Sequence, residues 1–211
     1  MYDAHKTETQ EITSSDSWLM QYYTEDKHTL DDTEDDVTEP AFILTTCPAQ
    51  KYELDHVVGE GGMKTVYQTT DFDSNRKVAM AVLSRESKPS MVRRFVREAR
   101  ITAMLEHPNI VPIHDVGVNE EGEPYFVMKY VEGENLSTIL KKLRDGAAKY
   151  RKRYTVSYLL DIFQRVCNAI AFAHSKGVLH LDLKPSNIQV SDFGEVLVVD
   201  WGIAKIITPR D

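Results

Sequence analysis

The chain has 211 residues, a formal net charge of −8 and 42% hydrophobic residues, which is enough for one good core or two small lobes of a globular protein. No apolar run approaches the roughly 20 residues that cross a bilayer, and residues 1–21 are polar and acidic, so neither a membrane span nor a signal peptide is expected. Cys47 and Cys167 lack the spacing of metal ligands, so a reduced, cytoplasmic setting is the expectation.

The negative charge is concentrated at the start of the chain. Residues 1–40 hold 12 acids and two bases, whereas the rest of the chain holds 21 acids and 23 bases. This first segment is rich in Thr, Ser, Asp and Glu and lacks a sustained apolar period. It predicts an acidic, flexible tail over residues 1–45, so the acidity says little about the folded part.

Short apolar runs separated by turn residues begin at Tyr52 and predict β-strands. The expected strands are residues 54–58, 64–70, 77–83, 110–118 and 124–130. Between the third and fourth strands, residues 90–106 predict a helix with Ser90 as its N-cap. This part of the chain is therefore expected to form a five-stranded antiparallel sheet with one long helix, in an α+β fold.

The next part of the chain is expected to be mainly helical. A short helix is predicted over residues 135–144 and a longer one over residues 156–175. The longer helix has an apolar stripe at helical spacing, which indicates a core face and comprises Leu159, Ile162, Phe163, Val166 and Ile170. Strands over residues 188–190 and 195–199 are predicted to form a hairpin.

The residues with the clearest chemistry lie around this hairpin, in the segment HLDLKPSN at residues 180–187 and in a later Asp-Trp-Gly. Asp182 can accept a proton from a hydroxyl group, and Lys184 can face a γ-phosphate. Asn187 and Asp200 can ligate Mg²⁺. This combination indicates a site for metal-bound triphosphate.

These motifs and their order resemble the Hanks-type serine/threonine protein kinases, in a bacterial-like form, over residues 52–211. The resemblance implies an N-lobe and hinge over residues 46–131 and part of a C-lobe over residues 132–211. It also implies ATP and Mg²⁺ as cofactors and transfer of phosphate to Ser or Thr hydroxyls of a protein substrate.

The family's activation segment and substrate platform would follow Asp211, so a truncated C-lobe is expected and the activity of this chain is in question. The helix over residues 156–175 should then leave apolar surface exposed. Either the chain is a fragment of a longer protein, or self-association or a partner covers that face.

A glycine-rich loop precedes the second predicted strand. By the resemblance, Gly59, Gly61 and Gly62 approach the phosphates of ATP. Lys64 occupies the third glycine position of the loop, and Ala81 occupies the position of the strand lysine that contacts the α/β-phosphates in the family.

Three explanations of Ala81 remain open: a pseudokinase that has lost activity, an engineered substitution, or relocation of the lysine. Lys64 begins a strand antiparallel to the one that carries Ala81, so its side chain could place an ammonium in the same cleft. This pattern resembles the With-No-Lysine kinases. Glu98, the expected helix glutamate, would then pair with Lys64.

The hinge and the adenine slot also follow from the resemblance. Met128 matches the gatekeeper, and the backbone of Lys129, Tyr130 and Val131 would bind the adenine edge. The residues expected to line the slot are Val58, Val66 and Ala79.

Asp192 and Leu181 also bear on the predicted site. Asp192-Phe193-Gly194 spells the family's metal motif, but it follows Asn187 too closely for a hairpin to form between them, so Asp192 is interpreted as a turn residue. Leu181 replaces the arginine that normally pairs with a phosphate on the activation segment, which indicates activity that is not switched by that phosphate.

Residues 141–153 contain seven Lys or Arg side chains. A solvated basic face is the favoured interpretation, and binding of the acidic tail is a second one. Nucleic acid is not the expected partner, because Tyr150 and Tyr154 are the only aromatic residues among or next to these bases.

One alternative to a catalytic function is kept: a pseudokinase that acts as a nucleotide-binding or scaffolding module.

Overall fold

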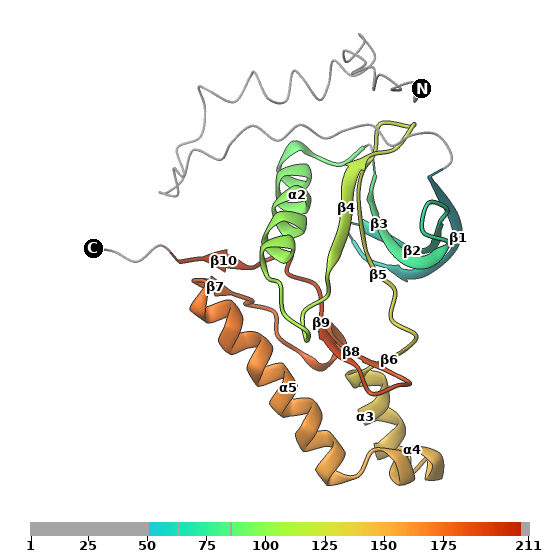
Figure 1. Ribbon diagram of the computed structural model, residues 1–211, viewed down its shortest axis with the longest axis vertical. Helices are drawn as coiled ribbons and strands as arrows, with labels where there is room; N and C mark the ends of the chain where they lie inside the picture. Colours follow the sequence, from blue (N-terminus) through green and yellow to red (C-terminus); the bar gives the residue numbers. More distant parts are fainter. Residues whose placement is uncertain (1–50, 63, 85, 208–211) are drawn as a thin grey trace, which may run out of the picture. The chain divides into compact units, whose positions relative to one another are not determined.

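The computed structural model describes residues 51–62, 64–84 and 86–207, so the predicted acidic tail lies outside the described residues. A five-stranded antiparallel sheet occupies the first part of this region, as predicted (Figure 1). In order across the sheet, its strands are β1 (Tyr52–Glu60), β2 (Lys64–Asp71), β3 (Arg76–Leu83), β5 (Pro124–Lys129) and β4 (Ile113–Val118).

Successive residues of β3 point to opposite faces of this sheet. Val78, Met80 and Val82 belong to a small apolar cluster on one face. Ala79 and Ala81 point to the other face, on which Phe126 of β5 packs against Phe95 of the helix α2 (Pro89–Met104), with ring centroids 4.9 Å apart. The sheet therefore has one face for its own core and one that it shares with α2.

Helix α2 begins one residue earlier than predicted. Its N-cap is Lys88, which makes no capping hydrogen bond through its side chain, and Pro89 stands in the first turn. Ser90 was therefore wrongly predicted as the cap. Proline suits the first turn because its φ is already near the helical value and its missing N–H would have had no partner inside the helix.

The predicted strand over residues 110–118 is shorter in the structure and begins at Ile113. The residues before it pair with a different part of the chain. Ile110 forms an isolated parallel bridge to Val198, and the N–H of Val111 donates to the carbonyl of Val198 at 3.1 Å. This connection ties the segment before β4 to the strand that precedes Asp200.

The second part of the described region contains three helices and several short strands (Figure 1). The helices are α3 (Leu136–Arg144), α4 (Ala148–Arg153) and α5 (Val156–Ser175), and η2 (Pro185–Asn187) is a 3₁₀ turn. The strands are β6 (Gly133–Asn135), β7 (Val178–Leu179), β8 (Ile188–Ser191), β9 (Val196–Val198) and β10 (Lys205–Ile206). The order β6-β8-β9 makes one small sheet, and β7 pairs with β10.

Helix α5 has the predicted length, but its core face differs from the predicted stripe. Ile162 and Val166 are buried as predicted, whereas Phe163 is 65% exposed. Phe163 follows Ile162 by one residue, which places it about 100° around the helix from the core face. The exposed Phe163, together with the exposed Val156 and Leu160, gives α5 the uncovered apolar side that was expected. Among the described helices, none is both long and apolar enough to cross a membrane.

Gly133 is expected to be indispensable for the junction between β6 and β8. A Cβ at this position would lie 2.1 Å from the carbonyl oxygen of Val190 and 2.7 Å from the Cα of Ser191, and both are backbone atoms of β8. Gly133→Ala should therefore lower the free energy of unfolding by about 3 kcal/mol, the upper part of the range for overpacking. The measurement is denaturant unfolding followed by circular dichroism.

Gly62→Ala is the matched control, because nothing lies within 4 Å of a Cβ at Gly62. Its unfolding free energy should stay within about 0.5 kcal/mol of the parent value. Equal stability of both variants would show that β6 and β8 do not pack as closely as described.

Candidate active site

The loop before η2 holds a cluster of polar side chains centred on Asp182. The ammonium of Lys184 donates to Asp182 Oδ2 at 2.7 Å. The amide nitrogen of Asn187 donates to the carbonyl of Asp182 at 2.9 Å and to its Oδ2 at 3.2 Å. These donors favour the carboxylate, and the hydrogen bond from Lys184 is the main reason that the pKa of Asp182 lies below its ordinary value. Asp182 is thus held as a carboxylate, which can accept a proton.

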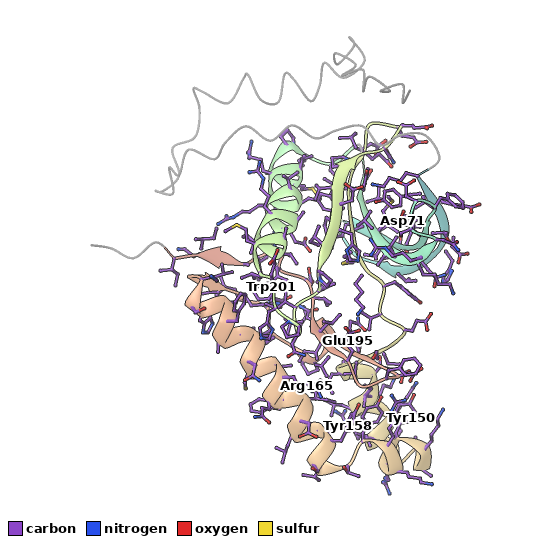
Figure 2. The ribbon with its side chains drawn as sticks, in the orientation of Figure 1. Asp71, Tyr150, Tyr158, Arg165, Glu195 and Trp201 are labelled. Atoms are coloured by element: carbon purple, nitrogen blue, oxygen red, sulfur yellow. The ribbon has the colours of Figure 1, made fainter. Side chains whose placement is uncertain are left out.

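His180 fixes the backbone of this loop. Its Nδ1 accepts the N–H of Asp182 at 3.2 Å, so Nε2 carries the proton and donates to the carbonyl of Val199 at 3.1 Å. Burial lowers the pKa of His180, in agreement with a neutral ring. The ring packs on Trp201, with centroids 4.5 Å apart (Trp201 is labelled in Figure 2). His180 is therefore a structural residue that joins the loop to the Asp-Trp-Gly segment.

Asp200 lies close to the Asp182 cluster because of the β8–β9 hairpin. The N–H of Val199 donates to the carbonyl of Asn187 at 3.0 Å, which brings the residues before Asp200 back to η2. Asp200 and Leu181 both have a left-handed φ, of 63° and 61°. Such conformations are unusual for residues other than glycine and concentrate at functional sites.

Asp192 occupies the turn of this hairpin. Its carboxylate accepts a hydrogen bond from Arg153 at 2.7 Å, and the N–H of Gly194, with φ of 84°, closes the turn on the carbonyl of Ser191. Asp192 is a turn residue away from Asp182, in agreement with the interpretation that Asp192-Phe193-Gly194 is not the metal motif.

Lys64 connects the sheet, α2 and the Asp-Trp-Gly segment. Its ammonium forms an ion pair with Glu98 Oε1 and lies 3.4 Å from Asp200 Oδ1. It also lies 5.4 Å from the centre of the Phe126 ring, close enough for a cation–π interaction. The pairing of Lys64 with Glu98 is the contact that a relocated lysine requires.

The register of β2 and β3 explains how Lys64 reaches this position. Lys64 lies opposite Leu83, and Val66 lies opposite Ala81. Residues directly opposite each other share a face, so Lys64 and Ala81 are diagonal neighbours on one face, at a separation of about 7 to 8 Å. Ala81 is completely buried. The side chain of Lys64 spans that distance and brings a charge to the region next to Ala81.

Glu98 is 7% exposed, and burial is the main reason that its pKa lies above the ordinary value, whereas Lys64 opposes the shift. A Cβ at Gly202 would lie 3.1 Å from Glu98 Oε2, so this glycine permits the close approach of the Asp-Trp-Gly segment to α2. Arg94 strengthens the approach, because its Nε donates to the carbonyl of Gly202 at 2.8 Å. Neither of these two contacts was predicted, and no sequence pattern distinguishes Arg94 from the other arginines of α2.

Two of the residues proposed for the adenine slot, Val66 and Ala79, share one face of the sheet. Ala79 lies opposite Met128 of β5, and Val66 lies two residues before Gln68, the β2 partner of Ala79. Val58 is exposed and lies at an irregularity in the pairing of β1 with β2.

The hinge residues Lys129, Tyr130 and Val131 are half-buried. The N–H of Lys129 donates to the carbonyl of Pro112 at 3.2 Å. That donor is therefore engaged within the protein.

The glycine-rich loop leaves space beside its backbone. A Cβ at Gly59 or Gly61 would have no neighbour closer than 3.6 Å, and one at Gly62 would have none within 4 Å. Packing therefore does not require these glycines, whereas close approach of phosphates to the backbone would. Asn187 uses its amide nitrogen on Asp182, so its side-chain oxygen is oriented away from that bond, and Asp200 adds a half-exposed carboxylate. These oxygens fit Mg²⁺, which prefers one or two carboxylates together with phosphate oxygens.

The comparisons with known proteins agree with this geometry. The family model described as "Protein kinase domain" matches residues 52–211. The chain belongs to the protein kinase family. Several relatives carry the name serine/threonine-protein kinase PknD. The relative from Chlamydia muridarum is 40% identical over 160 residues and the one from Chlamydia pneumoniae 38%. The relative from Protochlamydia amoebophila is 36% identical over 162 residues.

These matches cover 74% of this chain but only 16 to 17% of the relatives. The chain thus spans about a sixth of the length of the kinases that it matches. The α+β fold and the kinase family that the sequence indicated are confirmed. The individual roles of the site residues, including the lysine at position 64, remain hypotheses.

Lys64→Met should destabilise the kinase fold in a pH-dependent way. The substitution leaves the buried carboxylate of Glu98 unpaired, at a cost on the order of 2 to 3 kcal/mol at neutral pH. Because the pKa of Glu98 in the folded state lies above its unfolded value, protonation favours the folded state, and that contribution is lost as the pH rises through the folded pKa. Loss of Lys64 raises this pKa further. The stability difference from the parent should therefore shrink as the pH falls from about 7 to about 4.

Denaturant unfolding across this pH range measures the effect. Adding Glu98→Gln to Lys64→Met should remove the pH dependence of the difference. Lys205→Met, at an exposed strand position, serves as the control and should change stability little at any pH. A constant deficit for Lys64→Met at every pH would contradict the ion pair.

Proposed function

We propose that this chain carries the ATP- and Mg²⁺-dependent catalytic site of a serine/threonine protein kinase in which Lys64 replaces the missing strand lysine. The observation that carries the proposal is the position of the Lys64 ammonium, in contact with Glu98 and 3.4 Å from Asp200. A cation held between the helix glutamate and the metal-binding aspartate stands where the α/β-phosphates of a nucleotide would be bound.

Each residue then has a distinct role. Asp182 orients the substrate hydroxyl and accepts its proton, and its lowered pKa keeps it ionised for that task. Lys184, now bound to Asp182, would neutralise charge on the transferred phosphate. Asn187 and Asp200 would hold Mg²⁺, which when bound supplies charge neutralisation to the phosphate oxygens.

Relocation accounts for both departures from the family pattern at once. An engineered substitution at Ala81 would leave the ion pair of Lys64 with Glu98 without an explanation. Loss of activity by decay would leave unexplained the hydrogen bonds that hold Asp182, Lys184 and Asn187 together. No feature of the described residues favours the pseudokinase alternative over catalysis.

The setting of the site is also part of the proposal. The exposed apolar side chains of α5 suggest contact with a second copy, with further parts of a longer protein, or with a partner. Because the chain spans a small part of its relatives, only the class of its substrate is proposed: proteins that carry an accessible Ser or Thr hydroxyl. The usage of cysteine supports a cytoplasmic location.

Moving the lysine back should test the relocation. Lys64→Met should weaken Mg·ATP binding at least about tenfold, or 1.4 kcal/mol, because the cation facing the phosphates is lost. Lys64→Gly combined with Ala81→Lys restores the usual family pattern and should recover much of that affinity. Isothermal titration calorimetry with Mg·ATP measures both, with Lys205→Met as the control for loss of one positive charge.

Equal affinity of the parent chain and Lys64→Met would make Lys64 a bystander. Failure of the double variant, in a folded state verified by circular dichroism, would mean that only position 64 fits the lysine.

Asp182→Asn should separate binding from transfer. The variant keeps the hydrogen bonds of the loop but cannot take a proton, so phosphate incorporation into a Ser/Thr peptide library should fall at least about 100-fold. Mg·ATP affinity should change little. If the parent chain binds Mg·ATP and transfers no more phosphate than Asp182→Asn, the site is a nucleotide-binding module without catalysis.

A further inference from the structure

Helices α3 and α4 carry a dense group of basic residues. Residues 136–155 hold seven bases and a single acid, Asp145, although the whole chain carries a net charge of −8. We call this surface the basic rim, defined by the bases Lys141, Lys142, Arg144, Lys149, Arg151, Lys152 and Arg153. Such a local excess of one charge attracts partners of the opposite charge.

Two members of the basic rim already have structural partners. Lys142 binds Glu134 and the hydroxyl of Tyr150, and Arg153 binds the Asp192 carboxylate at 2.7 Å. The other five bases form no ion pair within the described part of the chain. The paired residues fix the shape of the surface, while the unpaired ones leave their charge available to a ligand.

A pocket of about 390 Å³ opens beside the basic rim, between the hinge and α4. Lys149 and Arg153 line it from α4, and Lys77 lines it from β3. Its acids are Glu132, Glu134 and Asp192. Glu134 is paired with Lys142, and Asp192 is paired with Arg153. The unpaired charges of the lining are therefore the positive Lys77 and Lys149 and the negative Glu132. The pocket can therefore accept an anionic side chain.

The aromatic residues of this region argue against nucleic acid as the ligand. Tyr150 and Tyr154 stack on each other with centroids 5.8 Å apart, and Tyr154 packs edge-on against Tyr158 of α5 at 5.5 Å. Figure 2 shows Tyr150 and Tyr158 where α4 and α5 meet. Tyr154 is buried, and the stacking leaves these rings engaged with one another rather than presented to bases.

We propose that the pocket and the basic rim together dock an acidic segment of a protein partner of this kinase. A Glu, Asp or phosphorylated side chain enters the pocket between Lys77 and Lys149, and further acids follow along Arg151 and Lys152. The inference rests on the proposed function only in taking the partner to be a substrate or regulator. The lining of the pocket does not include Asp182, so a docked segment leaves the site around Asp182 free.

The test is direct binding of a short fluorescent peptide rich in Glu and Asp to the full chain, measured by fluorescence anisotropy. The control peptide carries Gln and Asn at the same places. Lys149→Glu combined with Lys152→Glu should weaken binding of the acidic peptide about tenfold, because two attractions become repulsions. Binding should also disappear toward 1 M salt, where the Debye length falls to about 3 Å.

The matched variant is Lys176→Glu with Lys205→Glu, which changes the net charge equally at exposed positions outside the basic rim. It should bind the acidic peptide as tightly as the parent chain. Equal weakening in both double variants would mean non-specific attraction and overturn the proposal, as would equal binding of the Gln/Asn peptide. Tighter binding of a single-stranded oligonucleotide than of the acidic peptide would also overturn it. Because none of these measurements needs ATP, a catalytically inactive chain would leave the result valid.

Discussion

The ion pair between Lys64 and Glu98 is the interaction on which the arrangement of this site depends. A carboxylate that is 7% exposed is stable only with a partner that offsets its desolvation. In this chain that partner does not come from β3, where Ala81 is buried, but from the start of β2. The charge of Glu98 thus requires β2, the glycine-rich loop before it and α2 to keep one mutual position. The same ammonium approaches Asp200, so the Asp-Trp-Gly segment is included in this constraint.

A second set of contacts holds the catalytic loop against the Asp-Trp-Gly segment. His180 joins Asp182 to Val199 through its two ring nitrogens, and the carbonyl of Asn187 accepts the N–H of Val199. Both contacts need the β8–β9 hairpin to return the chain to η2. The two left-handed residues, Leu181 and Asp200, lie on either side of this connection. Their backbone strain is sustained because the hydrogen bonds around them leave the chain few alternatives.

Sequence reasoning predicted the sheet, α2, α5 and the members of the site because those features follow from local patterns and motif spacing. It missed α4, whose six residues are mostly basic and show no apolar period. It also missed β6, β7 and β10, whose two or three residues are too few to show one. Phe163 was misplaced because adjacent residues of an apolar helix can both suit a stripe until the partner surface is known. The hydrogen bond from Arg94 to Gly202 joins residues 108 apart, and only tertiary structure brings them together.

The hydrogen bond from Arg94 to Gly202 bears on how α2 and the Asp-Trp-Gly segment keep their mutual position. In the family pattern, an arginine next to the catalytic aspartate binds a phosphate on the activation segment. In this chain the exposed Leu181 takes the place of that arginine and cannot bind a phosphate. Arg94 instead binds the backbone of the Asp-Trp-Gly segment from α2, four residues before Glu98. One helix therefore supplies both the acid that holds Lys64 and the guanidinium that holds Gly202. The position of α2 and the position of the Asp-Trp-Gly segment are coupled through these two contacts, so a ligand that shifts α2 would act on both at once.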